Sequence, residues 1–333
     1  MIWNARVLQD EFLPKEVVHR HTQMNRIAGA LEPVVEGDKP QNAFLVGPSG
    51  AGKTCIARYS LDRLQEQLLE VDTHYVDCWQ HSKRFRVLYK VLEGVGTTYD
   101  IHRSTPHDEM LQRLETLDTP YIVVMDEVDQ LEDKDVLREL YAIPNITMVL
   151  IANREEDVVA TLDERIQSRL RSSEKIRFEK YGDDEIYSIL QDRVRWGLDP
   201  ECISSGQLRR IAEAAAGNAR DAISILRSAA RRAELNDQET ISNTLIEEAV
   251  PEARAEIRQK NVERLNAHQQ ALYNVICDVG EISPSDLHSR YEDVVDEPRT
   301  KRTCRNYLSK LQRYNLINAH GEGRSRVYTP VGD

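Results

Sequence analysis

One stretch of the sequence has the pattern of a phosphate-binding loop. It consists of Gly47, Pro48, Ser49, Gly50, Ala51, Gly52, Lys53 and Thr54, which matches G-x-x-x-x-G-K-[ST]. An apolar run at 42–46 precedes the loop and apolar residues at helical spacing follow over 54–69, so a strand, a loop and a helix are predicted in that order. The glycines allow backbone N–H groups to face phosphate oxygens, Lys53 would reach the β and γ phosphates, and the Thr54 hydroxyl would ligate Mg²⁺. This context favours a nucleotide site over a chance glycine-rich turn.

A pair of carboxylates follows a second apolar strand, residues 121–125. Asp126 and Glu127 come directly after that strand, where parallel sheets bind their ligands. Asp126 is therefore predicted to hold Mg²⁺, and Glu127 to orient and polarise the attacking water. The alternative is a solvated acidic loop, and Asp129 is assigned to that class.

Asn153 ends the next apolar strand, residues 149–152. A neutral amide beside the γ-phosphate can position water and respond to the nucleotide state, whereas an isolated Asn after a strand is usually a turn former. The interpretation of Asn153 as a site residue depends on its register with Asp126 and Lys53.

Two arginines are candidates for stabilising charge on the γ-phosphate. Arg220 opens the predicted helix 219–234 and is expected over the nucleotide, while Arg169 lies in the predicted helix 162–170 and is expected to face a neighbouring subunit. Most arginines on helices are solvated or paired with acids. Both roles therefore depend on the family resemblance described below.

Alternating strands and helices must position these residues. Predicted strands at 42–46, 74–78, 121–125 and 147–151 alternate with helices, which indicates a parallel sheet covered on both faces. Helical patterns alone follow at 183–196, 205–215, 219–234 and 241–260. Three further helices at 267–279, 283–291 and 298–314 precede a glycine-turned hairpin, which is the outline of a winged helix-turn-helix. The predicted domains are an α/β nucleotide-binding domain at 1–178, a helical domain at 179–262 and a winged-helix domain at 263–333.

Composition limits the class of protein. The 333 residues carry a net charge of −12, and 30% of them are charged. No stretch approaches the roughly 18 to 20 apolar residues of a membrane span, so no membrane association is expected. The five cysteines form no Cys-x-x-Cys pair, which favours a reducing cytoplasm and cysteines buried in cores over a zinc site or disulfides.

Positive charge is concentrated near the C-terminus. Residues 265–333 carry nine Lys or Arg and nine Asp or Glu, and residues 299–313 contain no acid. This helix would keep its apolar stripe inward and present basic and amide side chains to the major groove, with two arginines flanking the hairpin tip. The predicted DNA-binding residues are Arg299, Lys301, Arg302, Arg305, Asn306, Arg324 and Arg326. The alternatives are a solvated basic face or a protein-docking winged helix.

The order of these motifs resembles the AAA+ ATPases, and the C-terminal winged helix makes it similar to the archaeal origin-recognition initiators. The resemblance begins at 12–14 and 19–20 and continues through 217–222 and the final domain, so it covers nearly the whole chain. It implies that the N-terminal segment folds over adenine, with Arg20 among the ATP contacts. Residues 96–111 occupy the place of an initiator-specific insertion that contacts DNA, although Asp100, Asp108 and Glu109 reduce the positive potential there.

The resemblance implies a replication initiator that binds ATP or ADP with Mg²⁺, recognises double-stranded origin repeats and helps load the replicative helicase. Slow, regulatory hydrolysis, neighbouring copies or paralogues on DNA and a cytoplasmic, nucleoid-associated location are also expected. Two alternatives stay open. One is a transcription regulator whose nucleotide module gates the winged helix, and the other is a remodelling or loading ATPase without DNA specificity of its own.

Overall fold

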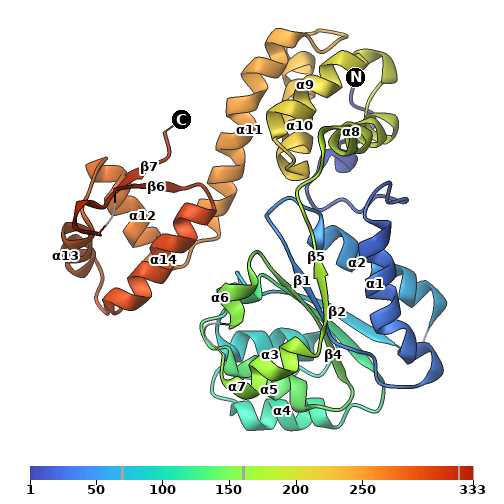
Figure 1. The fold of residues 1–333 in the computed structure, drawn as a ribbon, viewed down its shortest axis with the longest axis vertical. Helices are drawn as coiled ribbons and strands as arrows, with labels where there is room; N and C mark the ends of the chain where they lie inside the picture. Colours follow the sequence, from blue (N-terminus) through green and yellow to red (C-terminus); the bar gives the residue numbers. More distant parts are fainter. Residues whose placement is uncertain (69–70, 160–161, 322, 333) are drawn as a thin grey trace. The chain divides into compact units, whose positions relative to one another are not determined.

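The computed structural model describes residues 1–68, 71–159, 162–321 and 323–332, and the chain forms two compact units, Met1–Ser242 and Asn243–Asp333. The first unit contains a five-stranded sheet (Figure 1). Its strands are β1 (Ala43–Val46), β2 (Asp72–Asp77), β3 (Tyr121–Asp126), β4 (Ile146–Ala152) and β5 (Glu174–Arg177). Their order is β2-β3-β4-β1-β5 and every pairing is parallel. The predicted α/β class with a parallel sheet is confirmed.

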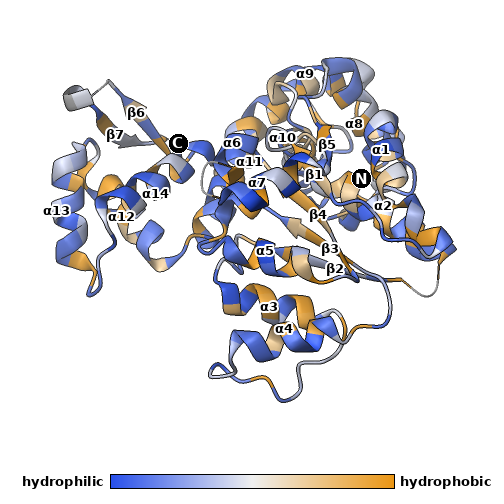
Figure 2. Cartoon of the chain, turned by 60° about the horizontal axis from the view of Figure 1, so that its bottom comes forward, coloured by the Kyte–Doolittle hydropathy of each residue, from blue (hydrophilic) through white to orange (hydrophobic). Residues whose placement is uncertain are grey.

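Helices cover both faces of this sheet because β3 and β4 are apolar on both sides, and all their residues are buried. Figure 2 shows both strands mainly in the hydrophobic colour. Alternate residues of β3 enter separate cores, with Ile122 and Val124 on one face and Val123 and Met125 on the other. The first core includes α1 (His21–Leu31) and α2 (Lys53–Gln67), and the second includes α3 (Arg84–Glu93), α4 (His107–Glu115), α5 (Asp135–Ala142) and α7 (Glu164–Arg171).

Three helices complete the first unit after the sheet. They are α8 (Asp183–Gly197), α9 (Ser205–Ala215) and α10 (Ala219–Leu235). Local sequence determines where two of them begin: Ser204 and Gln207 form a capping box at α9, and the Asn218 side chain caps α10. Short elements connect the rest: η1 (Ala5–Leu8), η2 (Glu32–Glu36), η3 (Val128–Gln130), α6 (Glu155–Val159) and η4 (Pro200–Cys202).

The second unit has the predicted order of helices followed by a hairpin. It contains α11 (Asn243–Glu263), α12 (Ala267–Val279), α13 (Pro284–Val294), α14 (Lys301–Arg313), β6 (Ile317–His320), η5 (Gly323–Ser325) and β7 (Val327–Pro330). The two strands are antiparallel, and Ile282 bridges to Tyr328 of β7. Leu272, Leu287, Leu308 and Leu311 are among its buried side chains.

The structure corrects several sequence expectations. Helices α1, α4 and α5 and edge strand β5 were not predicted. Strand β5 lacks a continuous apolar run, since only one of its residues is buried. The expectation that all five cysteines lie in cores is wrong, since Cys277 is exposed and Cys55 is half-buried. Helix boundaries shift by one to three residues at several ends. No helix within the described ranges combines the length and apolar character needed to cross a bilayer.

Candidate nucleotide site and nucleic-acid interface

The phosphate-binding loop connects β1 to α2 and adopts conformations that favour glycine. Gly50 and Gly52 have φ angles of +74° and +91°. A Cβ at Gly50 would lie 1.8 Å from Asn218 Oδ1, and one at Gly52 would lie 2.3 Å from the Tyr181 hydroxyl oxygen. No side chain caps the first turn of α2, so its N–H groups are left for an anion.

Lys53 is held at the centre of this loop and is only 7% exposed. Its Nζ donates to the carbonyl oxygens of Gly47 at 2.6 Å and Pro48 at 2.8 Å, and to Asn153 Oδ1 at 3.1 Å. The pKa of Lys53 is lowered to about 8, chiefly by burial; nearby carboxylates oppose this shift, and the charge of Arg220 adds to it. The structure therefore brings Lys53 and Asn153 together, as their predicted register requires.

Thr54 and Asp126 also meet in this site. The Thr54 hydroxyl donates to Asp126 Oδ2 at 2.6 Å, and Asp126 Oδ1 accepts from the backbone N–H of Glu127 at 2.8 Å. Tyr75 on β2 donates its hydroxyl to the same Oδ2 at 3.0 Å. Burial, and then the Asp126 charge, raise the pKa of Tyr75, so this hydroxyl stays protonated as a donor.

The sequence analysis did not identify Tyr75 as a site residue. The sequence held only part of the signal: Tyr75 is the second residue of the strand predicted at 74–78, and in the structure it pairs in register with Val124 of β3. The order β2-β3 that brings Tyr75 beside Asp126 is a property of the folded sheet.

Glu127 lies directly beyond β3 in the left-handed region, with φ 56° and ψ 45°. This conformation is uncommon for a residue with a side chain and occurs mostly where surrounding structure enforces it, often at functional sites. Here η3 begins immediately after Glu127, and the Gln130 N–H donates to the Glu127 carbonyl at 2.8 Å. The turn leaves Glu127 on the wall of the cleft.

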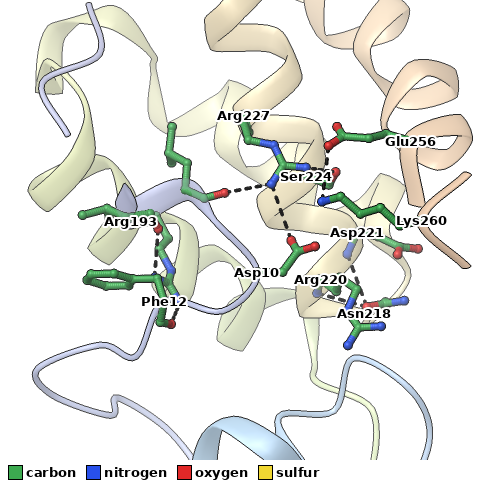
Figure 3. A network of polar contacts seen from close by, with 12 residues as sticks. Asp10, Phe12, Arg193, Asn218, Arg220, Asp221, Ser224, Arg227, Glu256 and Lys260 are labelled. Atoms are coloured by element: carbon green, nitrogen blue, oxygen red, sulfur yellow. Dashed lines mark hydrogen bonds and ion pairs between the residues drawn. The ribbon is translucent and has the colours of Figure 1, made fainter. Parts of the chain in front are cut away.

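The start of α10 contacts the phosphate loop from the helical side. The Ala219 N–H donates to the Gly50 carbonyl at 3.1 Å, and the Tyr181 N–H donates to the Gly217 carbonyl at 3.1 Å. Asn218 Oδ1 accepts from the N–H groups of Arg220 and Asp221, which fixes the first turn of α10 (Figure 3). Arg220 is half-buried and lines the cleft; its predicted contact with the nucleotide stays a prediction.

One cleft contains these groups and extends beyond them. Its lining includes Lys53, Thr54, Asp126, Glu127, Asn153 and Arg220, together with largely apolar side chains from the N-terminal segment, α2, α8 and α10: Phe12, Pro14, Val17, Ile56, Ile189 and Ile223. A buried cation, an uncapped helix terminus and a hydroxyl–carboxylate pair suit a polyphosphate with a divalent cation. The apolar remainder suits a planar base. Arg193 also lines the cleft and was not identified from the sequence.

Comparisons with known proteins agree with this geometry. Residues 37–160 match the family model described as an AAA domain, and residues 187–251 match the Cdc6 AAA+ ATPase-type lid domain. The chain is 46% identical over 333 residues to ORC1-type DNA replication protein 9 of Halobacterium salinarum, covering 99% of this chain and 94% of the relative. It belongs to the ORC1-type DNA replication proteins.

A second relative and a solved structure support the same assignment. ORC1-type DNA replication protein 1 of Halobacterium salinarum is 50% identical over 308 residues, which cover 92% of this chain and all of the relative. The structure of the Aeropyrum pernix ORC1 protein in complex with DNA is similar with a TM-score of 0.81 and 25% identity, over 100% of this chain and 94% of that one. The present ORC1-type protein is thus a replication initiator and an AAA+ ATPase, as its motifs predicted.

Two predicted arginines lie outside the cleft of this ORC1-type protein. Arg20 is not among the lining residues; its guanidinium lies 3.9 Å from the Tyr181 ring centre and donates to the Glu179 carbonyl at 2.5 Å. The predicted contact between Arg20 and ATP stays a prediction. Arg169 is exposed on α7 and lies over the Tyr141 ring at 4.7 Å. Its predicted contact with a neighbouring subunit stays a prediction.

The predicted DNA-binding residues of the second unit lie on and around α14. Lys301, Arg302, Arg305 and Asn306 are exposed, whereas Cys304, Leu308 and Leu311 are buried. Lys310, from the same basic stretch, is also buried. Arg326 is exposed directly before β7, and the side chain of Arg324 in η5 lies outside the described residues.

Two other features bear on a nucleic-acid interface. Arg299 is exposed ahead of α14, where its N–H donates to the Tyr291 hydroxyl at 3.0 Å and its Nε to His268 Nε2 at 3.3 Å. In the insertion-like segment 96–111, Asp100 and Glu109 both pair with Arg113. Their charges are therefore partly compensated within the protein.

Proposed function

We propose that the cleft of the first unit binds ATP or ADP with Mg²⁺. The observation that carries this proposal is the convergence of Lys53, Thr54, Asp126, Asn153 and Arg220 on one cleft from four separate parts of the chain. Lys53 would neutralise the β and γ phosphates, and the Thr54 hydroxyl and Asp126 carboxylate would hold the metal. When bound, Mg²⁺ supplies charge neutralisation to the phosphates.

Hydrolysis would depend on groups at the rim of the same cleft. Glu127 would accept a proton from the attacking water, Asn153 would orient that water, and Arg220 would stabilise negative charge on the γ-phosphate. We assign Arg169 to the corresponding site of a neighbouring subunit. Slow turnover suits a regulatory role, because the nucleotide state itself then determines how the helical lid engages Gly50.

DNA binding is assigned to the second unit. The exposed face of α14 would enter the major groove with Lys301, Arg302, Arg305 and Asn306, and Arg299 would contact the backbone beside it. Arg324 and Arg326 would contact phosphates or the minor groove from the hairpin. The Aeropyrum pernix ORC1 protein, similar to this chain over its full length, has been solved in complex with DNA, which supports this proposal.

We take residues 1–178 as the nucleotide-binding domain, 179–262 as the lid and 263–333 as the winged helix. The full proposal is a nucleoid-associated initiator that recognises double-stranded origin repeats, assembles there with copies or paralogues and recruits the replicative helicase. ATP would bias the position of the lid, and hydrolysis would remove that bias.

A crosslinking map of the protein on its own genome, with and without the Arg302→Ala/Arg305→Ala double substitution, tests this function. The expected result is sharp occupancy at inverted repeats in early-replicating DNA, lost in the variant. Occupancy spread over promoters would support a transcription regulator instead. Occupancy that does not depend on the two arginines would support a remodelling or loading ATPase that meets DNA through partners.

A further inference from the structure

The segment that runs from the end of η1 towards the start of α1 forms part of the cleft wall. We call residues 7–19 the strap. Asp10, Phe12, Pro14, Val17 and His19 of the strap all line the cleft. The chain before the strap is attached to the end of α8, where the N–H groups of Trp3 and Asn4 both donate to the Gly197 carbonyl. The strap therefore runs from the helical lid to α1 of the α/β part.

Arg193 of α8 binds the strap directly. It is 6% exposed, and its Nη1 donates to the Val7 carbonyl at 2.9 Å while Nη2 donates to the Phe12 carbonyl at 3.3 Å. Its guanidinium carbon also lies 4.8 Å from the centre of the Phe12 ring. Figure 3 shows Arg193 and Phe12 side by side. Hydrogen bonds from a charged donor to main-chain carbonyls hold both ends of the 7–12 segment in place.

The burial of Arg193 shows that this contact is not a solvated surface interaction. Burial lowers the pKa of Arg193, with smaller opposing effects from Cys55, Asp192 and Asp10. A buried guanidinium is tolerated only when its donors are satisfied, and here they are satisfied by the strap. Loss of the strap would leave this charge without those partners.

A second lid arginine binds the strap between the two Arg193 contacts. Arg227 on α10 donates Nη1 to the Leu8 carbonyl at 3.1 Å, and the same nitrogen lies 3.6 Å from Asp10 Oδ1. Its Nη2 donates to Ser224 Oγ at 3.0 Å (Figure 3). Both arginines belong to lid helices, so the lid holds residues 7–12 of the strap, whereas the Lys15 carbonyl further along accepts from Tyr59 and Arg63 of α2.

The strap contributes to the part of the cleft wall that is not formed by the predicted phosphate- and metal-binding residues. Lys53, Thr54 and Asp126 occupy the polar part of the cleft, whereas Phe12 shares the remaining wall with apolar residues of α2, α8 and α10. An aromatic ring held in a mainly apolar wall suits stacking or edge contact with a planar base. The base of a bound nucleotide would thus contact a surface whose position the lid determines.

We propose that Arg193 is a positioning residue for nucleobase recognition, which places Phe12 against the base of the nucleotide and couples base binding to the lid. The inference rests on the proposed function insofar as the cleft must bind a nucleoside triphosphate. In this role Arg193 acts through the strap, by its bonds to the Val7 and Phe12 carbonyls.

Calorimetry with two ligands separates this role from a general effect on the cleft. Wild-type protein, Arg193→Met and Arg195→Met are each titrated with ATP and with inorganic tripolyphosphate in the presence of Mg²⁺. Arg195 is the matched control, because it lies on the same helix over the Trp196 ring but is exposed and outside the cleft.

We expect Arg193→Met to weaken ATP binding about tenfold and to leave tripolyphosphate affinity unchanged, since charged hydrogen bonds contribute on that scale. Arg195→Met should alter neither affinity.

Each other outcome has a defined meaning. Equal losses for ATP and tripolyphosphate, or no loss for ATP, would overturn the positioning role. Wild-type protein that bound neither ligand would instead remove the proposed nucleotide function, which makes the two failures distinguishable.

Two further variants keep the test informative if Arg193→Met does not fold. Phe12→Ala should lose affinity for ATP but not for tripolyphosphate, and Arg193→Lys, which keeps the charge, should lose less than Arg193→Met. In the Phe12→Ala background, Arg193→Lys should cause little additional loss, because both act on the same contact. Additive losses would contradict the inference.

Discussion

The hydroxyl of Thr54 and the carboxylate of Asp126 are 72 residues apart in the chain, and they form a 2.6 Å hydrogen bond in the folded protein. Thr54 is the second residue of α2 and Asp126 ends β3, so the bond joins the end of the phosphate loop to the acidic end of the strand. Tyr75 donates to the same Asp126 oxygen from the neighbouring strand. The pair is therefore oriented by a third side chain before any ligand binds.

Tyr75→Phe removes the hydroxyl that donates to Asp126 and keeps the aromatic ring. Partners that orient a metal-binding carboxylate typically change metal affinity by 10 to 100 fold, so we expect the Mg²⁺ concentration needed for half-maximal ATP binding to rise by about tenfold. Fluorescence titration of ATP binding against Mg²⁺ measures this. Tyr121→Phe is the control, because the Tyr121 hydroxyl donates to the Val91 carbonyl at the opposite end of β3 from Asp126. An unchanged Mg²⁺ requirement in Tyr75→Phe would show that Asp126 needs no such support.

ATP affinity should fall as the pH rises above about 8. The pKa of Lys53 in the free protein is lowered from 10.5 to about 8 by burial, so Lys53 becomes neutral above that pH. Bound phosphate favours the charged amine, and binding must then take up a proton, which weakens affinity by up to about tenfold per pH unit. Calorimetry from pH 6.5 to 9.5 checks this, and Lys53→Arg should show a flat profile.

The lowered pKa of Lys53 has the opposite effect on folding, because it should make the ligand-free protein more stable as the pH rises. Between pH 8 and 10.5 the unfolded chain retains the Lys53 proton that the folded protein releases. The contribution of Lys53 to the free energy of unfolding therefore increases over that interval. Urea unfolding of the wild type and Lys53→Arg at several pH values measures the difference, and a wild-type stability that fell relative to Lys53→Arg would disprove the lowered pKa.

Glu127→Gln should bind ATP normally and hydrolyse it poorly. The amide keeps the size of the side chain but cannot accept the proton from water, and loss of a general base usually slows a reaction by about 10² to 10⁴ fold. Phosphate release in single-turnover conditions measures the rate. Asp129→Asn is the control, because Asp129 does not line the cleft. Normal turnover in Glu127→Gln would require another base.

Arg302→Ala/Arg305→Ala should weaken binding to duplex DNA and reduce its salt dependence. Both side chains are exposed on α14, and each positive charge that no longer helps to neutralise the phosphates flanking the groove lowers the slope of log K against log salt by up to about one. Fluorescence anisotropy at several salt concentrations measures the affinity and the slope together. Arg290→Ala, an exposed arginine on α13, should leave both unchanged. Equal binding by the double variant and the wild type would remove α14 from the interface.

Local patterns in the sequence predicted most of the elements that position the site. The apolar strands ending at Asp126 and Asn153, and helix α9 at Ser205–Ala215, appear where the periodicity places them. This works because burial on both faces demands continuous apolar runs in β3 and β4, and because capping residues mark helix starts. Edge strand β5 lacks such a run and was missed, since only Ile176 of its residues is buried.

The residues expected to bind phosphate could also be predicted, because the backbone N–H groups, the lysine and the threonine all lie within one continuous loop, Gly47–Thr54. Residues that lie far in the sequence from the groups they contact could not be predicted in this way. Tyr75 reaches Asp126 only because β2 pairs in register with β3, and Arg193 reaches the strap only because α8 packs beside residues 7–12. The contact of Arg20 with the Tyr181 ring likewise joins distant parts of the chain.

The sequence by itself thus determined the fold class, the family and the phosphate chemistry of this initiator, because those depend on short contiguous patterns. Only the tertiary structure decided which lid and strand side chains orient the site. Hydrogen bonds such as Arg193 to Val7, 186 residues apart, arise from the packing of whole helices and strands, and no local spacing encodes that packing.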